Sequence, residues 1–158
     1  AGLLLGIAFL FSNNICCFFD IASVENSNIG LYIVGGPDSL VSKYKILSKS
    51  EKAILTGHVD YSKVPLYLRA IDIAVIPLFE NQHGLTTSPI KLFEYMAAGK
   101  TILASNLSSL NEILSTSEAL FFEPGNVQDL AQKINFISKD SSLAVNSSTR
   151  PVRSVSLS

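Results

Sequence analysis

Residues 87–94 have the types and spacing of an anion site followed by a site for hydroxyl groups. Residues 88–100, SPIKLFEYMAAGK, predict a helix, because a capping serine precedes a proline and a glycine follows the apolar part. The start of a helix offers unpaired backbone N–H groups and a partial positive charge, which suit a diphosphate. We therefore expect the N–H groups of Thr87, Ser88 and Ile90 to bind one.

Glu94 follows one helical turn later, at the border of the helix's apolar side. At about 100° per residue, that side comprises Ile90, Leu92, Phe93, Met96 and Ala97. A half-buried carboxylate must find donors, because desolvating it unpaired costs several kcal/mol. One alternative is a helical pair with Lys91, worth about 0.2 to 0.5 kcal/mol. The other is a ligand with hydroxyls, such as a ribose about 6 Å along the helix from a bound phosphate.

These residues require a scaffold, and short apolar runs alternate with segments of helical spacing along the chain. The expected strands are residues 30–36, 52–59, 72–78, 100–105 and 119–125. The expected helices are residues 38–49, 62–71, 88–98, 107–114 and 126–140. Strands that are apolar on both faces belong in a parallel sheet covered on both sides. The order predicts a Rossmann-like, doubly wound α/β fold, whose ligands bind outside the carboxyl ends of the strands.

The 158 residues, 47% of them hydrophobic, suit one domain. We expect an apolar segment at residues 1–29, the α/β domain at 30–140, and a disordered serine-rich tail at 141–158. The opening AGLLLGIAFLF is interpreted as a buried or truncated element rather than a signal peptide or membrane anchor. No basic residue precedes it, and it is shorter than the roughly 20 apolar residues that span a membrane.

Several function classes are disfavoured by composition and motifs. A net charge of −1 without a basic run argues against nucleic acid as a partner. Cys16 and Cys17 are adjacent, which rarely permits a disulfide, and no ligand spacing predicts a metal, so reduced thiols and a cytoplasmic chain are expected. The G-x-G-x-x-G fingerprint is absent from the sequence, which disfavours a nicotinamide-dependent oxidoreductase. No cofactor is expected.

The order of segments resembles the carboxy-terminal, donor-binding domain of retaining GT-B glycosyltransferases of the glycosyl transferase group 1 family. The resemblance covers about residues 30–139 and rests on LYIVGGP, ILTGHV, DIAVIPL, TTSPIKLFEYMAAGKTILASNLSSLNEIL and ALFFEPGNVQDLAQKI. It implies the C-terminal half of a GT-B fold. It also implies a nucleotide-diphosphate sugar as donor, usually a UDP- or GDP-sugar, and no obligatory metal.

The resemblance implies roles for individual residues. Glu94 would bind the ribose hydroxyls, residues 87–90 would hold the diphosphate, and the loops at Gly36-Pro37 and His58-Val59 would border the base. No catalytic residue is assigned, because Thr86 stands where many family members carry a glutamate that contacts the transferred sugar.

The resemblance also implies an acceptor-binding domain, and an Arg and a Lys that bind phosphate where the donor domain opens; this sequence shows neither. We therefore expect a truncated glycosyltransferase that binds a nucleotide sugar but is inactive alone, because transfer occurs between two domains. The alternative, which Thr86 favours, is a non-catalytic nucleotide-sugar-binding module or subunit. Expected partners are the nucleotide sugar and the acceptor-binding domain or a partner chain, and a peripheral membrane contact stays open.

Overall fold

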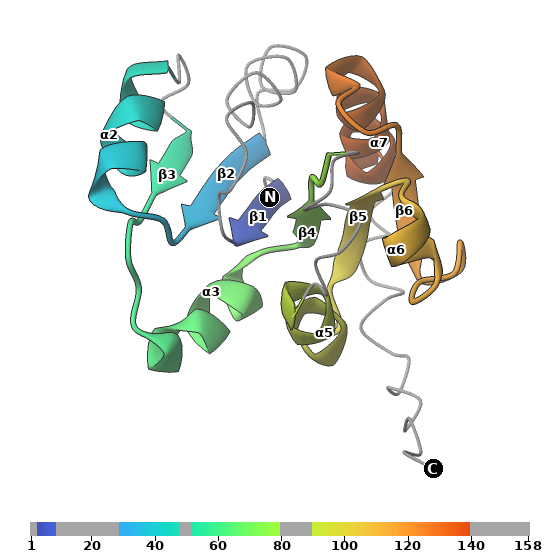
Figure 1. Ribbon diagram of the computed structural model, residues 1–158, viewed down its shortest axis with the longest axis horizontal. Helices are drawn as coiled ribbons and strands as arrows, with labels where there is room; N and C mark the ends of the chain where they lie inside the picture. Colours follow the sequence, from blue (N-terminus) through green and yellow to red (C-terminus); the bar gives the residue numbers. More distant parts are fainter. Residues whose placement is uncertain (1–2, 9–28, 48–51, 80–89, 140–158) are drawn as a thin grey trace.

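A computed structural model describes residues 3–8, 29–47, 52–79 and 90–139. Within these residues, one parallel sheet of six strands has the order β3-β2-β1-β4-β5-β6 (Figure 1). The strands are β1 Leu3–Ala8, β2 Ile29–Val34, β3 Ala53–Leu55, β4 Ile73–Ile76, β5 Thr101–Ser105 and β6 Ala119–Phe122. This is the strand order of doubly wound Rossmann folds, so the predicted α/β class is confirmed.

Strand β1 is a departure from the five strands expected from the sequence. It lies in the middle of the sheet, where Leu3 to Ala8 pair with Ile29 to Val34 of β2 and two of its residues also pair with β4. A short apolar run that is too brief to span a membrane fits the centre of a parallel sheet, where both faces of a strand are covered. Part of the apolar segment 1–29 is therefore a strand of the same sheet as the residues that follow it.

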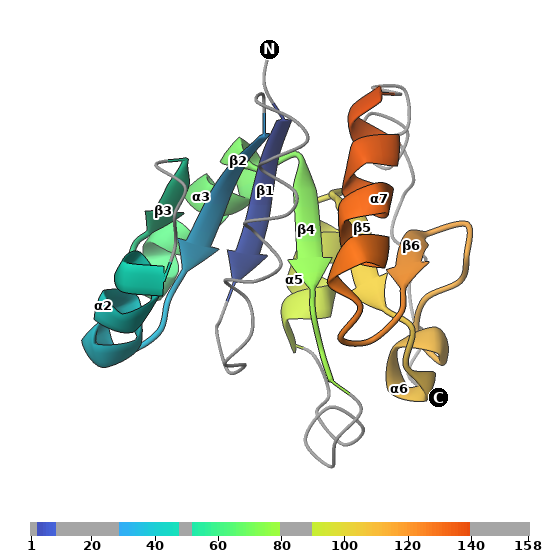
Figure 2. The same cartoon turned by 90° about the horizontal axis from the view of Figure 1, so that it is seen from above.

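The helices lie on both faces of the sheet. They are α2 Asp38–Leu47, the 3₁₀ helix η1 Tyr61–Lys63, α3 Val64–Ala70, α5 Ile90–Ala97, α6 Ser108–Asn111 and α7 Val127–Lys139. Figures 1 and 2 show α2 and α7 on one face and α3 and α5 on the other. All five expected helices have a counterpart, although α6 ends at Asn111, short of the predicted residue 114.

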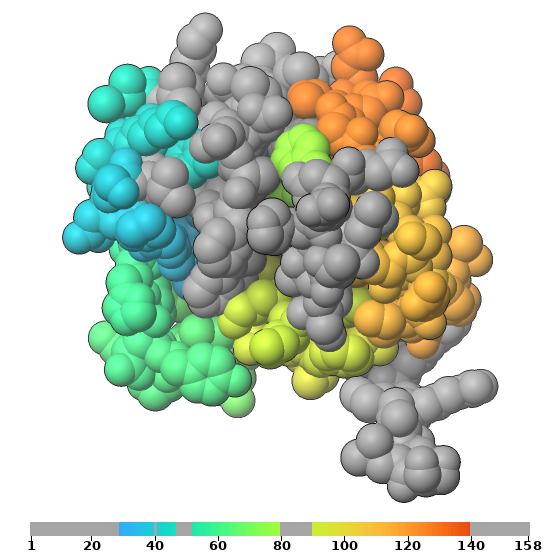
Figure 3. All heavy atoms as spheres, viewed as in Figure 1, coloured from blue at the N-terminus to red at the C-terminus, as the bar shows by residue number. Residues whose placement is uncertain are grey.

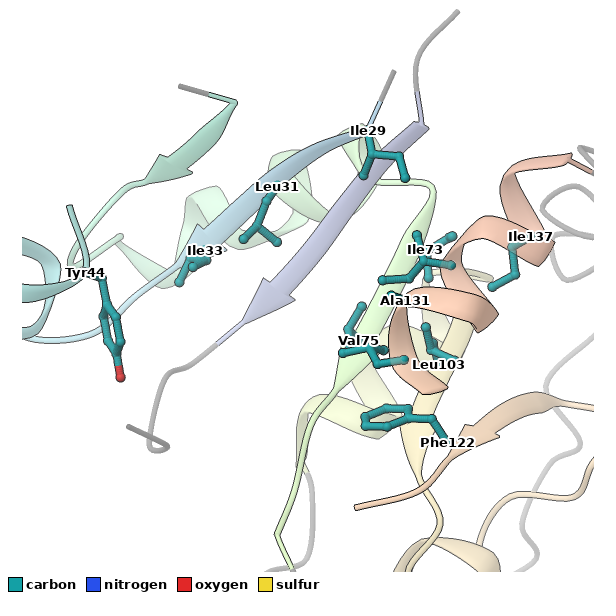
Figure 4. Close-up of a cluster of buried hydrophobic side chains, with 12 residues drawn as sticks. Ile29, Leu31, Ile33, Tyr44, Ile73, Val75, Leu103, Phe122, Ala131 and Ile137 are labelled. Atoms are coloured by element: carbon teal, nitrogen blue, oxygen red, sulfur yellow. The ribbon is translucent and has the colours of Figure 1, made fainter. Parts of the chain in front are cut away.

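Two hydrophobic cores explain why β4 is apolar at every position. Ile73 and Val75 point toward α7, where Figure 4 shows them near Ala131 and Ile137. Ala74 and Ile76 belong to the second core, with residues of α5 and α6. Successive side chains of a strand point to opposite faces, so a strand covered on both sides has no polar face.

The carboxyl ends of the strands share one edge of the sheet (Figure 2). Neighbouring strands β1 and β4 are parallel, and the chain continues from them to opposite halves of the sheet, β2 on one side and β5 on the other. The point between β1 and β4 is therefore the topological switch, beside which ligands of such sheets bind. The predicted tail, residues 141–158, lies outside the described residues.

Candidate functional site

Helix α5 follows β4, so its first residue, Ile90, lies on the side of the sheet where the strands end, next to the topological switch. The side chain of Ile90 is 70% exposed, and the first turn carries no acidic residue. Thr86, Thr87 and Ser88 lie outside the described residues. The roles of Thr87 and Ser88 at a diphosphate therefore stay predictions.

The apolar side predicted for α5 is wrong at Ile90, Phe93 and Ala97, whereas Leu92 is buried as predicted and Met96 packs against the core. The buried side chains are Leu92 and Tyr95, whereas Phe93 is 50% exposed and Ala97 is also exposed. The sequence interpretation did not include Tyr95 in the apolar set, yet its ring packs in the core with residues of β4 and β5. The buried side is turned by roughly 100°, one residue, from the predicted one, because Ile90, Phe93 and Ala97 are exposed.

Glu94 is half-buried, as predicted, with 15% of its side chain exposed. Lys91 Nζ lies 2.8 Å from Glu94 Oε2, which confirms the pair between neighbouring turns of the helix. The hydroxyl of Tyr61, in η1, donates to Oε1 at 3.5 Å. Lys91 Nζ also lies 5.9 Å from the centre of the Tyr61 ring. These contacts tie α5 to the connection between β3 and α3.

An open pocket of about 460 Å³ lies between η1 and α3 on one side and α5 with the residues after it on the other. It is lined by Tyr61, Val64, Pro65, Leu68, Arg69, Glu94, Ala97, Ala98 and Lys100. The surfaces of α3 and α5 meet along the lower edge of the face shown in Figure 3. Small-molecule sites commonly have this volume and a mainly apolar lining with a few polar groups, and Glu94 supplies one such group here.

The loops after β2 and β3 lie side by side. An antiparallel bridge joins them, in which the Gly35 N–H donates to the Gly57 carbonyl oxygen at 2.9 Å. Gly36 follows with φ of +94°, and a Cβ placed on it would meet no atom of the described residues within 4 Å. The backbone at Gly36 is therefore open to the approach of a ligand.

The predicted base-bordering residues are brought together by this bridge. Gly36 and Pro37 follow β2, and His58 and Val59 follow β3 directly after Gly57. His58 is exposed and Val59 is half-buried. Tyr61 lies two residues beyond Val59, and its hydroxyl contacts Glu94. The connection after β3 therefore includes residues predicted to border the base and also contacts Glu94, the residue predicted to bind the ribose.

Asp60 fixes the local geometry of this connection. Its carboxylate accepts hydrogen bonds from the hydroxyl of Ser62 and, at 2.9 Å, from the backbone N–H of Ser62, which caps η1. These bonds, the hydroxyl first, lower the pKa of Asp60, and the nearby charge of His58 acts in the same direction. A hydrogen-bonded carboxylate favours its charged form, so η1 is capped by an anion at neutral pH.

Two further features are absent from the described residues. None of the described helices is long and apolar enough to cross a membrane. Among the same residues, no group of three or more His, Cys, Asp or Glu side chains could hold a metal ion. Cys16 and Cys17 lie outside the described part of the chain.

The strand order and the helices on both faces define the class of the chain, a Rossmann-like α/β domain. Comparison with known families gives the particular assignment. The family described as "Glycosyl transferases group 1" matches residues 17–140, which is most of the chain, and the chain belongs to this family.

Individual relatives agree with this assignment. TuaH of Bacillus subtilis (strain 168), named for teichuronic acid biosynthesis as a glycosyltransferase, is 34% identical over 80 residues, 49% of this chain and 20% of TuaH. The chain therefore spans a fifth of the length of that relative.

Solved structures show the same fold. The C-terminal domain of a glycosyl transferase group 1 family protein, LpcC of Francisella tularensis, has a TM-score of 0.69 at 21% identity, over 93% of this chain and 80% of that one. Anabaena HepE, solved in complex with UDP and glucose, has a TM-score of 0.70 at 18% identity, over 93% of this chain and 42% of that one. The fold thus matches that of GT-B glycosyltransferases.

Proposed function

We propose that the chain is the donor-binding domain of a longer, retaining GT-B glycosyltransferase and that it binds a UDP- or GDP-linked sugar. The observation that carries the proposal is Glu94, a half-buried carboxylate on the helix that starts beside the topological switch, in contact with the connection after β3. The nucleotide is suggested by HepE, a protein of the same fold that was solved with UDP.

In the proposed complex, the ribose hydroxyls donate to Glu94. An ionised carboxylate offers about four lone-pair sites, and within the described part of the chain the bonds from Lys91 and Tyr61 use one on each oxygen. Acceptor capacity is therefore left for two ribose hydroxyls. The diphosphate binds the N–H groups of Thr87, Ser88 and Ile90, and the base lies along Gly36-Pro37 and His58-Val59.

Transfer of the sugar, in this proposal, takes place between this domain and an acceptor-binding domain or partner chain. No catalytic role is assigned to a residue of this chain, and the isolated chain binds the donor without transferring it. The alternative, a non-catalytic nucleotide-sugar-binding module, is favoured by Thr86 in place of the glutamate that contacts the sugar in many family members. Sugar transfer by the full-length protein would decide between the two. The cytoplasmic location and a peripheral membrane contact stay predictions.

Calorimetric titration with UDP and GDP tests the donor site. Each charge-assisted bond to a ribose hydroxyl is worth about 1.5 to 3 kcal/mol, so Glu94→Gln should weaken binding of the preferred nucleotide roughly 10- to 100-fold. The matched control is Glu112→Gln, because Glu112 is an exposed glutamate at the end of α6. Equal affinity of Glu94→Gln and the parent, or no binding of either nucleotide to the parent, would overturn the proposal.

A further inference from the structure

The two carboxylate oxygens of Glu94 are held very differently. Oε2 accepts a charge-assisted bond from Lys91 at 2.8 Å, between side chains that are 23% and 15% exposed. Among the described residues, the donor to Oε1 is the Tyr61 hydroxyl at 3.5 Å, a distance at the outer limit of a hydrogen bond, from a side chain that is 73% exposed. One oxygen is therefore fixed, and the other is held by a contact that a better donor can replace.

Lys91 is placed so that it acts on the orientation of Glu94. It precedes Glu94 by three positions on α5, so both side chains lie on neighbouring turns, on the side that faces η1. Its Nζ lies within the roughly 6 Å range of a cation–π contact with Tyr61, which keeps the ammonium between the aromatic ring and the carboxylate. A glutamate held in this way has fewer rotamers to lose when a ligand arrives.

We propose that Lys91 is a positioning residue for the ribose contact: by binding Oε2 it presents Oε1 to the ribose hydroxyls, which displace the hydroxyl of Tyr61. The inference rests on the proposed function, because it names the group that orients the carboxylate of the same site. If the pair of Lys91 and Glu94 only stabilised the helix, removing Lys91 would not change ligand affinity in a way that depends on the ribose hydroxyls.

The test combines variants of the protein with a change in the ligand. The parent and Lys91→Met, which keeps an unbranched apolar side chain, are titrated with the preferred nucleoside diphosphate and with its 2′,3′-dideoxy analogue. Lys91→Met should weaken the ribose form about 2- to 12-fold, the equivalent of freezing one side chain at about 0.5 to 1.5 kcal/mol. Affinity for the dideoxy form should be the same in both proteins.

Three further variants sharpen the result. Lys91→Arg keeps the cation and should restore affinity for the ribose form. Lys133→Met, on α7 across the sheet, controls for the loss of a lysine and should change neither affinity. Tyr61→Phe removes the hydroxyl that is displaced, so it should leave affinity unchanged or raise it.

The possible failures are distinguishable. Suppose that the parent binds the ribose form more tightly than the dideoxy form. If Lys91→Met then has the parent's affinity for both ligands, or loses affinity for both equally, the positioning role is overturned, whereas the donor site is not. A clear loss of affinity in Tyr61→Phe contradicts the displacement of its hydroxyl. A parent that binds neither nucleotide, or does not distinguish the dideoxy form, overturns the proposed function itself. If Lys91→Met fails to fold, Lys91→Ala takes its place: a loss confined to the ribose form supports the positioning role, whereas an equal loss of both forms, or no loss, overturns it.

Discussion

The buried side of α5 can be tested with two side chains of the same carbon content on the same helix. Leu92 has no exposed surface and belongs to the core under α5, whereas Ile90, two residues earlier, is 70% exposed. Each is replaced by alanine, which removes the same number of carbon atoms from both. The sequence interpretation placed both residues on the apolar side of the helix, so only the tertiary structure predicts different results.

The expected magnitudes follow from burial. Leu92→Ala removes a fully buried side chain from a packed core, and such changes cost about 2 to 5 kcal/mol. Ile90→Ala should stay within about ±0.5 kcal/mol, because the side chain is mostly in water and alanine favours a helix more than isoleucine does. At about 2 to 4 °C per kcal/mol for a chain of this length, the Tm of Leu92→Ala should fall by roughly 4 to 20 °C.

Urea titration followed by circular dichroism measures both variants, since the chain has no tryptophan to report unfolding by fluorescence. A change in the midpoint at a constant slope isolates stability from changes in the compactness of the unfolded chain. Comparable losses in the two variants would show that α5 buries the side predicted from the sequence. A loss of less than about 1 kcal/mol in Leu92→Ala would equally refute the packing described here.

Two further predictions concern the connection that follows β3. Gly57 has φ of +70°, and a Cβ there would lie 3.4 Å from Asp38 Oδ1, an ordinary contact, so Gly57→Ala should lose about 1 to 2 kcal/mol through its left-handed backbone alone, measured as a lower urea midpoint. Because the bonds from Ser62 lower the folded-state pKa of Asp60, its contribution to stability is complete above the ordinary value of 3.8 and is lost as the pH falls through the lower folded-state value. Asp60→Asn should therefore reduce the acid dependence of the urea midpoint, and an unchanged pH profile would show that this cap contributes nothing.

Local patterns were sufficient for the elements that carry the fold. The run IAVI at residues 73–76 is apolar on both faces, and only a strand covered on both sides by helices can bury all of it. The pair of Glu94 with Lys91 also followed from positions on one helix, because residues three apart on a helix are neighbours whatever surrounds them. The resemblance to the family rested on the predicted strands and helices of residues 30–139, and the family matches residues 17–140.

Contacts between distant segments were decided by the tertiary structure alone. Tyr61 meets Glu94 across 33 positions, and the bridge between Gly35 and Gly57 joins two loops that no spacing rule connects. The apolar sequence of residues 1–11 does not indicate which strands it pairs with, yet Leu3–Ala8 pairs with both β2 and β4 at the centre of the sheet.

The side that α5 buries shows the physical reason for this division. Helical periodicity states which residues of α5 share a side, but the choice between a side with Phe93 and one with Tyr95 depends on the shape of the surface below. The sequence determined the elements and the charge pair within one helix, because backbone geometry sets those distances. Packing decided which elements contact one another, and with that the surroundings of Glu94. The reason is that the apolar faces of all the helices and strands must be buried together, which depends on the whole chain.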